Sequence, residues 1–378
     1  MIKTIGYVSE HNPFEDRRAW SGLIYKIREG IENAGYKVKW IPAKKTKLYT
    51  LAKTAQKLYY GKDAMTDFTN LSFRILSKEV QKNINGVDAL FFPDGAQVTK
   101  FLKTDLPVIY YGDATYRKMI GYYWHEKSAS CLRQGDGNER AALDRSTMVI
   151  KASQWAIDSV VKDYGQDPGK CHVLEFGANL DDKDIVPASV YKEGTLHVLF
   201  SGVDWERKGA GIAMDTIRIL NERGVSAKLI FCGISKENIP EEYRNLEYVE
   251  YAGFLNKNDK EQYARYIDAI KRSHIFLLPT KAECAGVVFS ESSAYGLPIF
   301  TYNTGGIPDY VVDGVNGYKL PSGSSAEKFA DKIEVCLRNN EFTALGEGGK
   351  RLYEEKLSWA AWSTRFKKLM EESKSYYI

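Results

Sequence analysis

The sequence predicts two doubly wound α/β domains, and three observations lead to this fold class. The chain has 378 residues, more than a single hydrophobic core usually organises. Short runs rich in β-branched and aromatic residues alternate with longer helical segments, which is typical of mainly parallel sheets covered by helices. An aperiodic stretch rich in Gly, Asp and Pro, residues 177–189, separates two such series and predicts a linker.

The expected elements follow this alternation. Strands of the first series are expected near residues 2–8, 37–41, 88–92, 107–111, 147–151 and 171–175, and those of the second near 196–201, 227–232, 247–251, 275–278 and 298–301. Helices are expected at 326–338, 342–356 and 359–373, the last with Trp359, Trp362, Phe366 and Met370 along one packing stripe. The predicted domains are residues 1–185 and 186–355, with 356–378 forming a C-terminal helix that packs back on the first domain.

Composition excludes several classes of protein. The chain is 44% hydrophobic and 27% charged, without an apolar stretch near the ~20 residues of a spanning helix. Its beginning enters a strand pattern directly and lacks a secretory signal, so a cytoplasmic location is expected. The five cysteines and five histidines show no metal-ligand spacing, so no metal site is expected. A net charge of +4 is too small to predict nucleic-acid binding.

Two carboxylates mark the first candidate site. Glu283 and Glu291 stand eight positions apart, the first in the loop after the 275–278 strand and the second in the helix that begins at Gly286. The free amides and positive dipole of a helix start suit a phosphate. Ionised carboxylates are pure acceptors and suit sugar hydroxyls. The pair therefore indicates a site for a nucleotide sugar.

A second signal follows the first strand of the second series. Arg207 and Lys208 stand before Gly209, where a helix is expected to begin, and this setting suits a diphosphate. The alternative is a solvated basic pair at a helix start. The segment lacks the third glycine and the downstream acidic residue of a dinucleotide fingerprint, so NAD binding is excluded.

These two motifs together resemble the retaining glycosyltransferases of family 4, including bacterial cell-surface glycan and lipopolysaccharide-core enzymes. The segments 16–22, 176–179, 251–254 and 305–309 are similar to that family as well, and the likeness is strongest from 196 to 320. The resemblance implies a GT-B fold, in which two Rossmann-like domains face each other across a cleft. It also implies an N-terminal acceptor-binding domain and a C-terminal domain that binds the nucleotide sugar.

The resemblance also implies roles for single residues. Arg207 and Lys208 would hold the donor diphosphate, Glu291 the ribose hydroxyls and Glu283 the donor sugar. The backbone amides of Ala285, Gly286, Val287 and Val288 would bind sugar or phosphate oxygens. The chain departs from the common pattern at Gly202-Val203, where many members have Gly-Arg, and at 284–286, where many have Gly-Phe-Gly. Arg207 would replace the missing cation.

In the first series, Gly22 and Asp113 are the candidates. Gly22 opens a helix and allows close approach of a phosphate or acceptor, although a glycine at a helix start is also ordinary. Asp113 follows the 107–111 strand. It either accepts or orients the proton of the acceptor hydroxyl, or caps the segment that begins at Ala114. The expected catalytic residues are Asp113, Lys208 and Glu283.

Residues 37–62 contain eight lysines and no acidic residue, and leucines recur within them at helical spacing. One interpretation is a peripheral contact with an anionic membrane or a track for a lipid-linked acceptor. The alternative is an ordinary helix packed on the first sheet, with its lysines in solvent.

The sequence thus predicts a retaining transferase that moves a sugar from a UDP- or GDP-sugar to a hydroxyl of a glycan, lipid-linked or protein-linked acceptor. No cofactor or metal is expected, because lysine and arginine neutralise the diphosphate. Two other functions stay open: a non-catalytic subunit that binds glycan or stabilises a partner transferase, and a nucleotide-sugar epimerase with the same fold.

Overall fold

The computed structural model describes residues 2–17, 19–61, 63–125 and 127–373. Its contacts divide the chain into two compact units. Unit 1 comprises residues 1–175 together with 362–378, and unit 2 comprises residues 176–361. In the structure, the boundaries between the two units fall after Glu175 and after Ala361. The domain boundaries expected at residues 185 and 355 stay predictions.

Unit 1 contains a six-stranded parallel sheet in the order β2-β1-β3-β4-β5-β6. Its strands are β1 (Thr4–Ser9), β2 (Lys37–Pro42), β3 (Ala89–Pro93), β4 (Val108–Gly112), β5 (Met148–Lys151) and β6 (Cys171–Val173). All residues of β3 and β4 are buried, as expected of central strands covered on both faces. The lysines of β2 alternate toward solvent, which suits its place at the edge.

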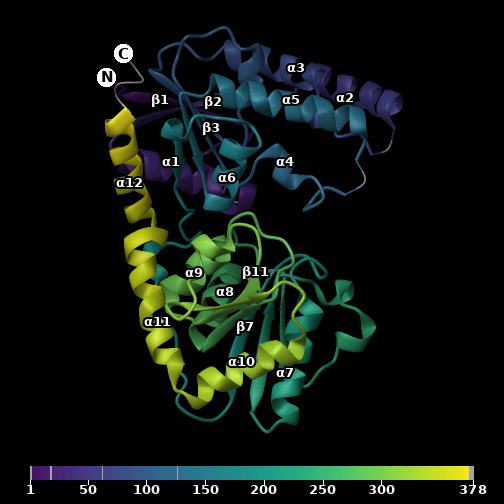
Figure 1. Cartoon of the computed structure of the whole chain (residues 1–378), viewed down its shortest axis with the longest axis vertical. Helices are drawn as coiled ribbons and strands as arrows, with labels where there is room; N and C mark the ends of the chain where they lie inside the picture. The colour runs from purple at the N-terminus through teal and green to yellow at the C-terminus, as the bar shows by residue number, and fades with distance from the viewer. Residues whose placement is uncertain (1, 18, 62, 126, 374–378) are drawn as a thin grey trace. The chain divides into compact units, whose positions relative to one another are not determined.

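The described helices that belong wholly or partly to unit 1 are α1 (Leu23–Asn33), α2 (Lys47–Tyr60), α3 (Asn70–Gln81), α4 (Tyr116–Met119), α5 (Ala129–Arg145), α6 (Gln154–Lys162) and α12 (Trp359–Glu372). Thr46 and Thr69 begin α2 and α3 by accepting hydrogen bonds from the amides of Tyr49 and Ser72. The helices α2, α3 and α5 lie beside one another (Figure 1).

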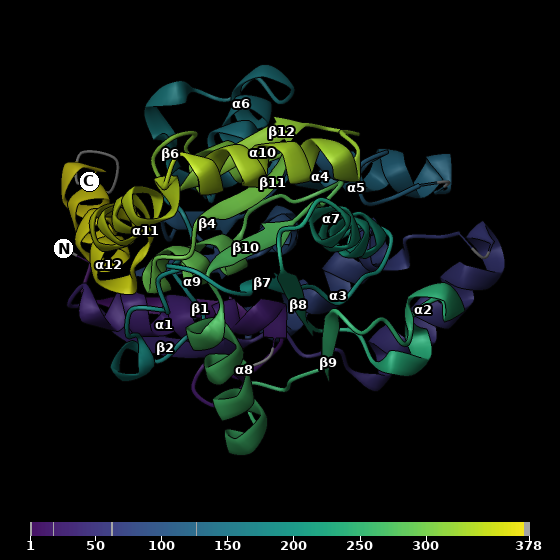
Figure 2. The ribbon, with the colours of Figure 1, turned by 90° about the horizontal axis from the view of Figure 1, so that it is seen from below.

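Unit 2 contains the second six-stranded parallel sheet, in the order β12-β11-β10-β7-β8-β9. Its strands are β7 (Leu196–Ser201), β8 (Ala227–Cys232), β9 (Val249–Gly253), β10 (Ile275–Leu278), β11 (Ile299–Asn303) and β12 (Gly317–Pro321). Its helices are α7 (Ala210–Glu222), α8 (Lys260–Arg272), α9 (Val287–Tyr295), α10 (Ala326–Arg338) and α11 (Glu341–Leu352). The helices α7 and α10 pack on each other, as Figures 1 and 2 both show.

Short helical turns connect these elements. They are η1 (Ala19–Gly22), η2 (Thr66–Phe68), η3 (Gln97–Phe101), η4 (Pro168–Lys170), η5 (Asp182–Asp184), η6 (Lys236–Asn238), η7 (Glu241–Tyr243), η8 (Ile307–Asp309) and η9 (Tyr353–Leu357). The stretch expected as a linker contains η5 and packs on unit 2, because Tyr295 donates to the Asp184 carbonyl and the Ala188 amide donates to the Tyr295 carbonyl.

The stripe predicted on the last helix is a packing face. Trp359, Trp362, Phe366 and Met370 are all buried. Within unit 1 the Trp362 indole donates to the Tyr111 hydroxyl at 3.0 Å and stacks on Phe366 at 4.9 Å between ring centroids. Within unit 2 the Trp359 indole donates to the Ala178 carbonyl at 2.8 Å.

The predicted α/β class is confirmed, since two parallel sheets with covering helices account for the two strand series. One strand was missed, β12, whose sequence begins with Gly317 and carries no run of β-branched residues. Among the helices that the structure describes, none is long and apolar enough to cross a lipid bilayer.

Candidate functional site

The loops after β7 and β10 are joined through their main chains. The Arg207 carbonyl accepts the amide of Lys281 at 2.7 Å and the hydroxyl of Thr280 at 3.2 Å. Gly209 has φ +69°, and a Cβ at this position would collide with the Pro279 carbonyl oxygen. Only glycine therefore allows this approach between the start of α7 and the end of β10.

This junction brings three predicted residues together. Lys208 is only 8% exposed, and its ammonium pairs with the Glu283 carboxylate. The Arg207 guanidinium lies 3.9 Å from the same carboxylate and donates to the Ala282 carbonyl at 3.2 Å. It also lies 3.6 Å from the Asp204 carboxylate. Two cations and one carboxylate thus converge from segments more than 70 positions apart, a concentration of charge that suits a charged, hydroxyl-bearing ligand.

The start of α9 adds backbone donors beside this cluster. The helix begins after Gly286 without a side-chain cap, and the first amides of a helix lack intrahelical acceptors. Ala285, Val287 and Val288 are half-buried, so this turn keeps some contact with solvent. A Cβ at Gly286 would meet the ring of Phe289. The predicted run of amides therefore stands in the expected strand-to-helix setting.

Glu291 lies in a different environment from Glu283. It is only 1% exposed, accepts a hydrogen bond from the Tyr266 hydroxyl at 2.7 Å and pairs with the Lys257 ammonium. That ammonium also lies over the Tyr266 ring, 4.4 Å from its centroid. Burial and the neighbouring Glu291 raise the pKa of Tyr266 well above its ordinary value, so the phenol stays a donor.

Sequence reasoning missed Lys257 and Tyr266. Lys257 lies in the loop after β9 and Tyr266 on α8, and neither stands in the motif around Glu291. The position of Lys257 after a strand end was the one available signal, because ligand-binding loops follow strand ends in such sheets. The contacts of Lys257 and Tyr266 with Glu291 form only in the folded chain, so no characteristic spacing in the sequence reveals them.

In unit 1, Gly22 begins α1 at the end of an unusual backbone run. Trp20, Ser21 and Gly22 have φ values of +49°, +56° and +82°. Positive φ is uncommon for residues other than glycine and is a clear outlier for a tryptophan. The indole of Trp20 lies close enough to the Asp113 carboxylate to lower its pKa, against the larger effect of burial. The two residues predicted in this unit, Gly22 and Asp113, are therefore linked through Trp20.

Asp113 follows β4, as predicted, but it does not cap the next helix. Thr115 begins α4 by accepting from the Lys118 amide. Burial, with the nearby Asp94 charge, raises the pKa of Asp113 to about 7. A carboxylate with this pKa is suited to proton exchange near neutral pH.

A buried ion pair that the sequence did not reveal lies beside Asp113. Lys151 has no exposed surface, lies 4.0 Å from the Glu139 carboxylate and donates to the Ala114 carbonyl at 2.9 Å. The Tyr110 hydroxyl donates to Glu139 at 3.0 Å. Burial raises the pKa of Glu139 and lowers that of Lys151. Strand β5 and helix α5 supply the pair.

The basic segment 37–62 divides into β2 and α2, and Lys62 lies outside the described residues. On α2, Leu51, Leu58 and Tyr59 are 69%, 85% and 82% exposed, whereas Tyr49 and Gln56 form the buried face. The helix therefore packs through Tyr49 and Gln56 and leaves its leucines largely in solvent, and both interpretations of the basic segment stay open.

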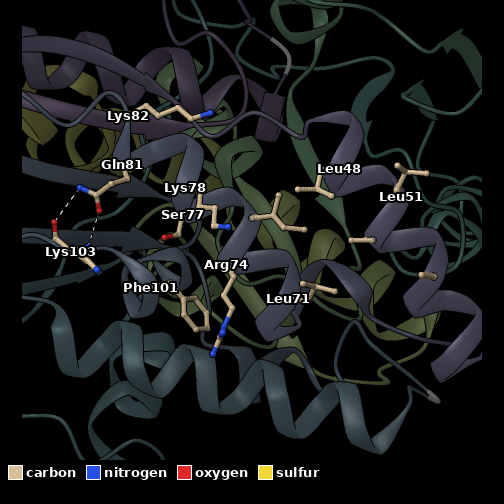
Figure 3. A pocket seen from close by; sticks show the side chains of 13 residues that line it. Leu48, Leu51, Leu71, Arg74, Ser77, Lys78, Gln81, Lys82, Phe101 and Lys103 are labelled. Atoms are coloured by element: carbon tan, nitrogen blue, oxygen red, sulfur yellow. Dashed lines mark hydrogen bonds between the residues drawn. The ribbon is translucent and has the colours of Figure 1, made fainter.

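A groove of about 910 Å³ runs between α2 and α3 (Figure 3). Leu48, Leu51 and Leu71 line its apolar part, and Arg74 and Lys78 extend from α3 on its other side. Lys82 and Lys103 also belong to its lining. The groove thus combines exposed apolar side chains with basic ones.

Comparisons with known proteins found a family model that matches the second half of the chain and curated relatives that match part of it. Residues 181–352 match the family model described as Glycosyl transferases group 1. An uncharacterized glycosyltransferase of Methanocaldococcus jannaschii is 27% identical over 187 residues, covering 48% of this chain and 50% of the relative. A D-inositol 3-phosphate glycosyltransferase of Corynebacterium efficiens is 26% identical over 254 residues, covering 62% of this chain and 58% of the relative. The chain thus spans between half and three fifths of these curated relatives.

Solved structures resemble the whole chain. Sucrose-phosphate synthase from Thermosynechococcus elongatus aligns with a TM-score of 0.73 at 14% identity, covering 99% of both chains. HepE of Anabaena in complex with UDP-glucose aligns with a TM-score of 0.66 at 13% identity, covering 98% of this chain and 99% of that one. The predicted fold is confirmed by these structures, and residues 181–352 match the model of the expected family. The roles of the site residues stay predictions.

Proposed function

We propose that the protein transfers a sugar from a nucleotide-diphosphate sugar to an acceptor hydroxyl, and the match of residues 181–352 to the model of the group 1 glycosyl transferases supports this proposal. The observation that carries the proposal is the convergence of Arg207, Lys208 and Glu283 at the junction of the β7 and β10 loops. A donor offers a diphosphate for the cations and hydroxyls for the carboxylate.

In this proposal, stabilisation of the leaving group supplies the main catalytic effect. Arg207, Lys208 and the first amides of α9 bind the diphosphate as negative charge develops on it. The bond between the sugar C1 and the phosphate oxygen breaks, and the acceptor oxygen forms a new bond to C1. Asp113 first accepts the hydrogen bond of the acceptor hydroxyl and orients it. As the new bond to C1 forms, that proton passes to the departing phosphate oxygen.

Retention of anomeric configuration and independence from metal complete the proposal. Attack from the face of the leaving group retains configuration, and it needs no carboxylate nucleophile. Two cations beside Glu283 supply the charge that a metal ion would otherwise bring to the diphosphate. Glu291, held by Tyr266 and Lys257, is assigned to the ribose hydroxyls.

The test begins with binding and release. The full chain is titrated with UDP, GDP and ADP and then incubated with their sugars in EDTA, with and without simple glycoside acceptors. We expect one nucleotide to raise the melting temperature, EDTA-resistant release of that nucleotide, and a product with the donor's anomeric configuration by NMR. Binding without release under any condition would favour the non-catalytic subunit. Epimerised donor would favour the epimerase, and an inverted product would exclude retention.

The proposal includes a peripheral membrane contact through α2 and the groove beside it. Leu51, Leu58 and Tyr59 stand in solvent, and the groove combines apolar walls with cationic side chains. Apolar side chains that enter the interface and lysines that attract anionic headgroups act together, each lysine contributing about 1 kcal/mol near a charged surface.

Flotation with phosphatidylglycerol vesicles tests this contact. The variant Lys57→Gln, Lys78→Gln, Lys82→Gln, Lys103→Gln should float much less than the native chain. The control Lys228→Gln, Lys236→Gln, Lys260→Gln, Lys328→Gln removes the same charge from exposed positions of unit 2 and should float normally. Equal recovery of the two variants would contradict the contact. A triple change of Leu51, Leu58 and Tyr59 to serine should also reduce flotation.

A further inference from the structure

A cavity of about 300 Å³ in unit 1 lies where several parallel strands end. Its lining includes Ser9 at the end of β1, Pro93 and Asp94 at the end of β3, and Asp113 after β4. Ligands of open α/β sheets bind at such carboxyl ends. The size suits one small cyclic group, and the walls decide which chemistry it can have.

One wall of the cavity is aromatic. Phe68, Tyr116 and Trp124 line it and pack on one another, with centroid separations of 5.2, 5.1 and 4.9 Å. Mutual packing holds these rings in place without a ligand. Fixed aromatic faces are suited to the apolar face of a sugar ring, whose C–H groups point away from its hydroxyls.

The remaining lining is rich in carboxylates: Glu10, Asp67, Asp94, Asp113 and Glu139. Lys45 lines the cavity and pairs with Glu10 at 2.6 Å. Lys53 pairs with Asp67 at 2.6 Å, and Lys151 lies 4.0 Å from Glu139. Three ammonium groups therefore accompany five carboxylates, and each of the three is already engaged by one of them.

Backbone strain concentrates around the same carboxylates. Asp94 has φ +72°, and its charge raises the pKa of Asp113. Trp20, whose indole lowers the pKa of the same carboxylate, has φ +49°. Conformations of this kind cost of order 1–3 kcal/mol each and are typical of functional sites. Asp94 and Trp20 are thus both held against local backbone preference beside Asp113.

We propose that this cavity binds the acceptor as an uncharged or amine-bearing sugar ring, and that it discriminates against acceptors carrying a phosphate or carboxylate. The ring packs on Tyr116 and Trp124, its hydroxyls donate to the carboxylates, and the hydroxyl to be glycosylated lies at Asp113. This inference rests on the proposed transfer reaction. It separates this chain from the curated relatives named for inositol 3-phosphate, because a phosphate in this cavity would face carboxylates.

The test compares matched ligands on the full chain. Methyl glucoside, methyl galactoside and methyl mannoside are titrated beside their 2-amino, 6-phosphate and uronate counterparts, with binding followed by NMR and calorimetry. We expect the neutral and amino forms to bind at least tenfold more tightly than the anionic forms in one sugar series. Equal or tighter binding of the anionic forms, or no binding in any series, would overturn the inference.

Variants locate the binding. Trp124→Leu should weaken glycoside binding at least tenfold, whereas Trp155→Leu, on α6 outside the cavity lining, should leave it unchanged. If Trp124→Leu lowers the melting temperature strongly, Glu10→Gln and Asp94→Asn replace it. They remove negative charge and keep the aromatic wall, and Asn tolerates positive φ. Each should reduce discrimination against the 6-phosphate at least threefold, and unchanged discrimination in both would contradict the assignment.

A parallel titration with UDP, GDP and ADP separates the two proposals. If one nucleotide binds and the glycoside preference is absent, the acceptor inference fails and the proposed transfer reaction stands. If no nucleotide binds, the proposed function fails, whatever the glycosides do.

Discussion

At the residue scale, the Lys208 ammonium has a partner before any donor binds. It pairs with Glu283, and both side chains are largely buried. In the proposed donor complex, the diphosphate would compete with Glu283 for Lys208, and the Glu283 carboxylate, still 3.9 Å from Arg207, would exchange that ion pair for hydroxyls of the attached sugar. Binding of the two halves of the donor would then be coupled through one exchange of partners.

Replacing Lys208 tests this exchange. Lys208→Ala should lower turnover by two or more orders of magnitude, because the leaving diphosphate loses a preorganised cation and Glu283 loses its partner. The measurement is the rate of nucleotide release under saturating donor, with the melting temperature as a check on folding. Lys228→Ala, an exposed lysine on β8, should retain the native rate. A Lys208→Ala rate within twofold of the native rate would remove this lysine from the mechanism.

The raised pKa of Asp113, about 7, makes the reaction pH-dependent. The ionised carboxylate is a strong acceptor for the hydrogen bond of the acceptor hydroxyl, and protonation removes its charge and makes it a much weaker acceptor. The rate at saturating substrates should therefore fall about tenfold for each pH unit below 7 and level off above it. A profile that stays flat from pH 5.5 to 8 would contradict this role.

Asp113→Asn provides the control for that titration. The variant should lack the inflection near pH 7. The folded-state pKa lies above the unfolded value of about 3.9, so the native chain's stability relative to the variant is fully present below pH 4 and is lost as pH rises through 7. The melting temperature of the variant minus that of the native chain should therefore increase from pH 4 to pH 7 and stay constant above pH 7.

Sequence reasoning located Arg207, Lys208 and Glu283 because each stands beside a glycine-bearing helix start that follows a strand, a local pattern. It could not locate Lys257 and Tyr266. Their contacts with Glu291 join β9, α8 and α9, and no spacing records a contact of that kind. The buried pair of Glu139 and Lys151 was equally hidden, since each residue alone looks like an ordinary surface charge.

At the element scale, the strongest signals were the helix starts and the hydrophobic strands. Helix α9 begins after Gly286 and ends at Gly296 with φ +72°, as the two glycines predict. Strand β12 was missed because it lies at the edge of its sheet, where a strand is less buried and needs few apolar residues. Gly317 begins it for a steric reason, since a Cβ there would collide with the Ile299 carbonyl. Such a contact becomes visible only in the folded sheet.

The α2 helix shows a different limit of periodicity. The spacing of its leucines predicted a helix, and the helix is present at Lys47–Tyr60. The buried side nevertheless carries Gln56, which donates from its amide to Ser72 at 3.2 Å. Periodicity identifies a helix and its apolar stripe, but a stripe that contacts a ligand or membrane looks the same as one that contacts the core.

The junction between α7 and β10 predicts a measurable difference between two glycines. Gly209 and Gly224 both have positive φ, +69° and +86°, but a Cβ at 209 would collide with Pro279 and one at 224 would meet open space. Gly224→Ala should cost about 1 kcal/mol of unfolding free energy from backbone strain alone. Gly209→Ala should cost at least twice as much and also weaken nucleotide binding, as measured by denaturant unfolding and calorimetry. Equal costs would contradict the steric role of Gly209.

At the scale of the whole molecule, each unit has its own parallel sheet and its own set of buried strands. The alternation of strand and helix patterns predicted both sheets, because parallel strands buried on both faces leave continuous apolar runs in the sequence. The boundary between the two units, after Glu175, was harder to predict from the sequence. Phe176 belongs to unit 2 through bonds to Tyr310 and Ser290, and these partners are more than 110 positions away in the chain.

Two units with separate cores should unfold in two calorimetric transitions. The proposed donor residues lie in unit 2, so the nucleotide that binds should raise only one transition. At a concentration 100 times its dissociation constant, the stabilisation is about 2.7 kcal/mol. Glu291→Gln should reduce the shift at the same nucleotide concentration, with both transitions still present. A single transition, or equal shifts of both, would contradict this assignment.

The bond between the Trp362 indole and the Tyr111 hydroxyl has a consequence for how the protein is made. It joins residues 251 positions apart within unit 1, so the whole of unit 2 is synthesised before the partner of Tyr111 exists. Growing chains are synthesised at roughly 5–20 residues per second, and their domains generally fold from the N-terminal end. In this protein the sheet of unit 1 is synthesised first but lacks its contact with α12 until the end of synthesis. The sheet of unit 2 can therefore fold earlier. At about those rates of synthesis, newly made unit 1 would therefore expose the apolar surface around Tyr111 for roughly ten seconds or more.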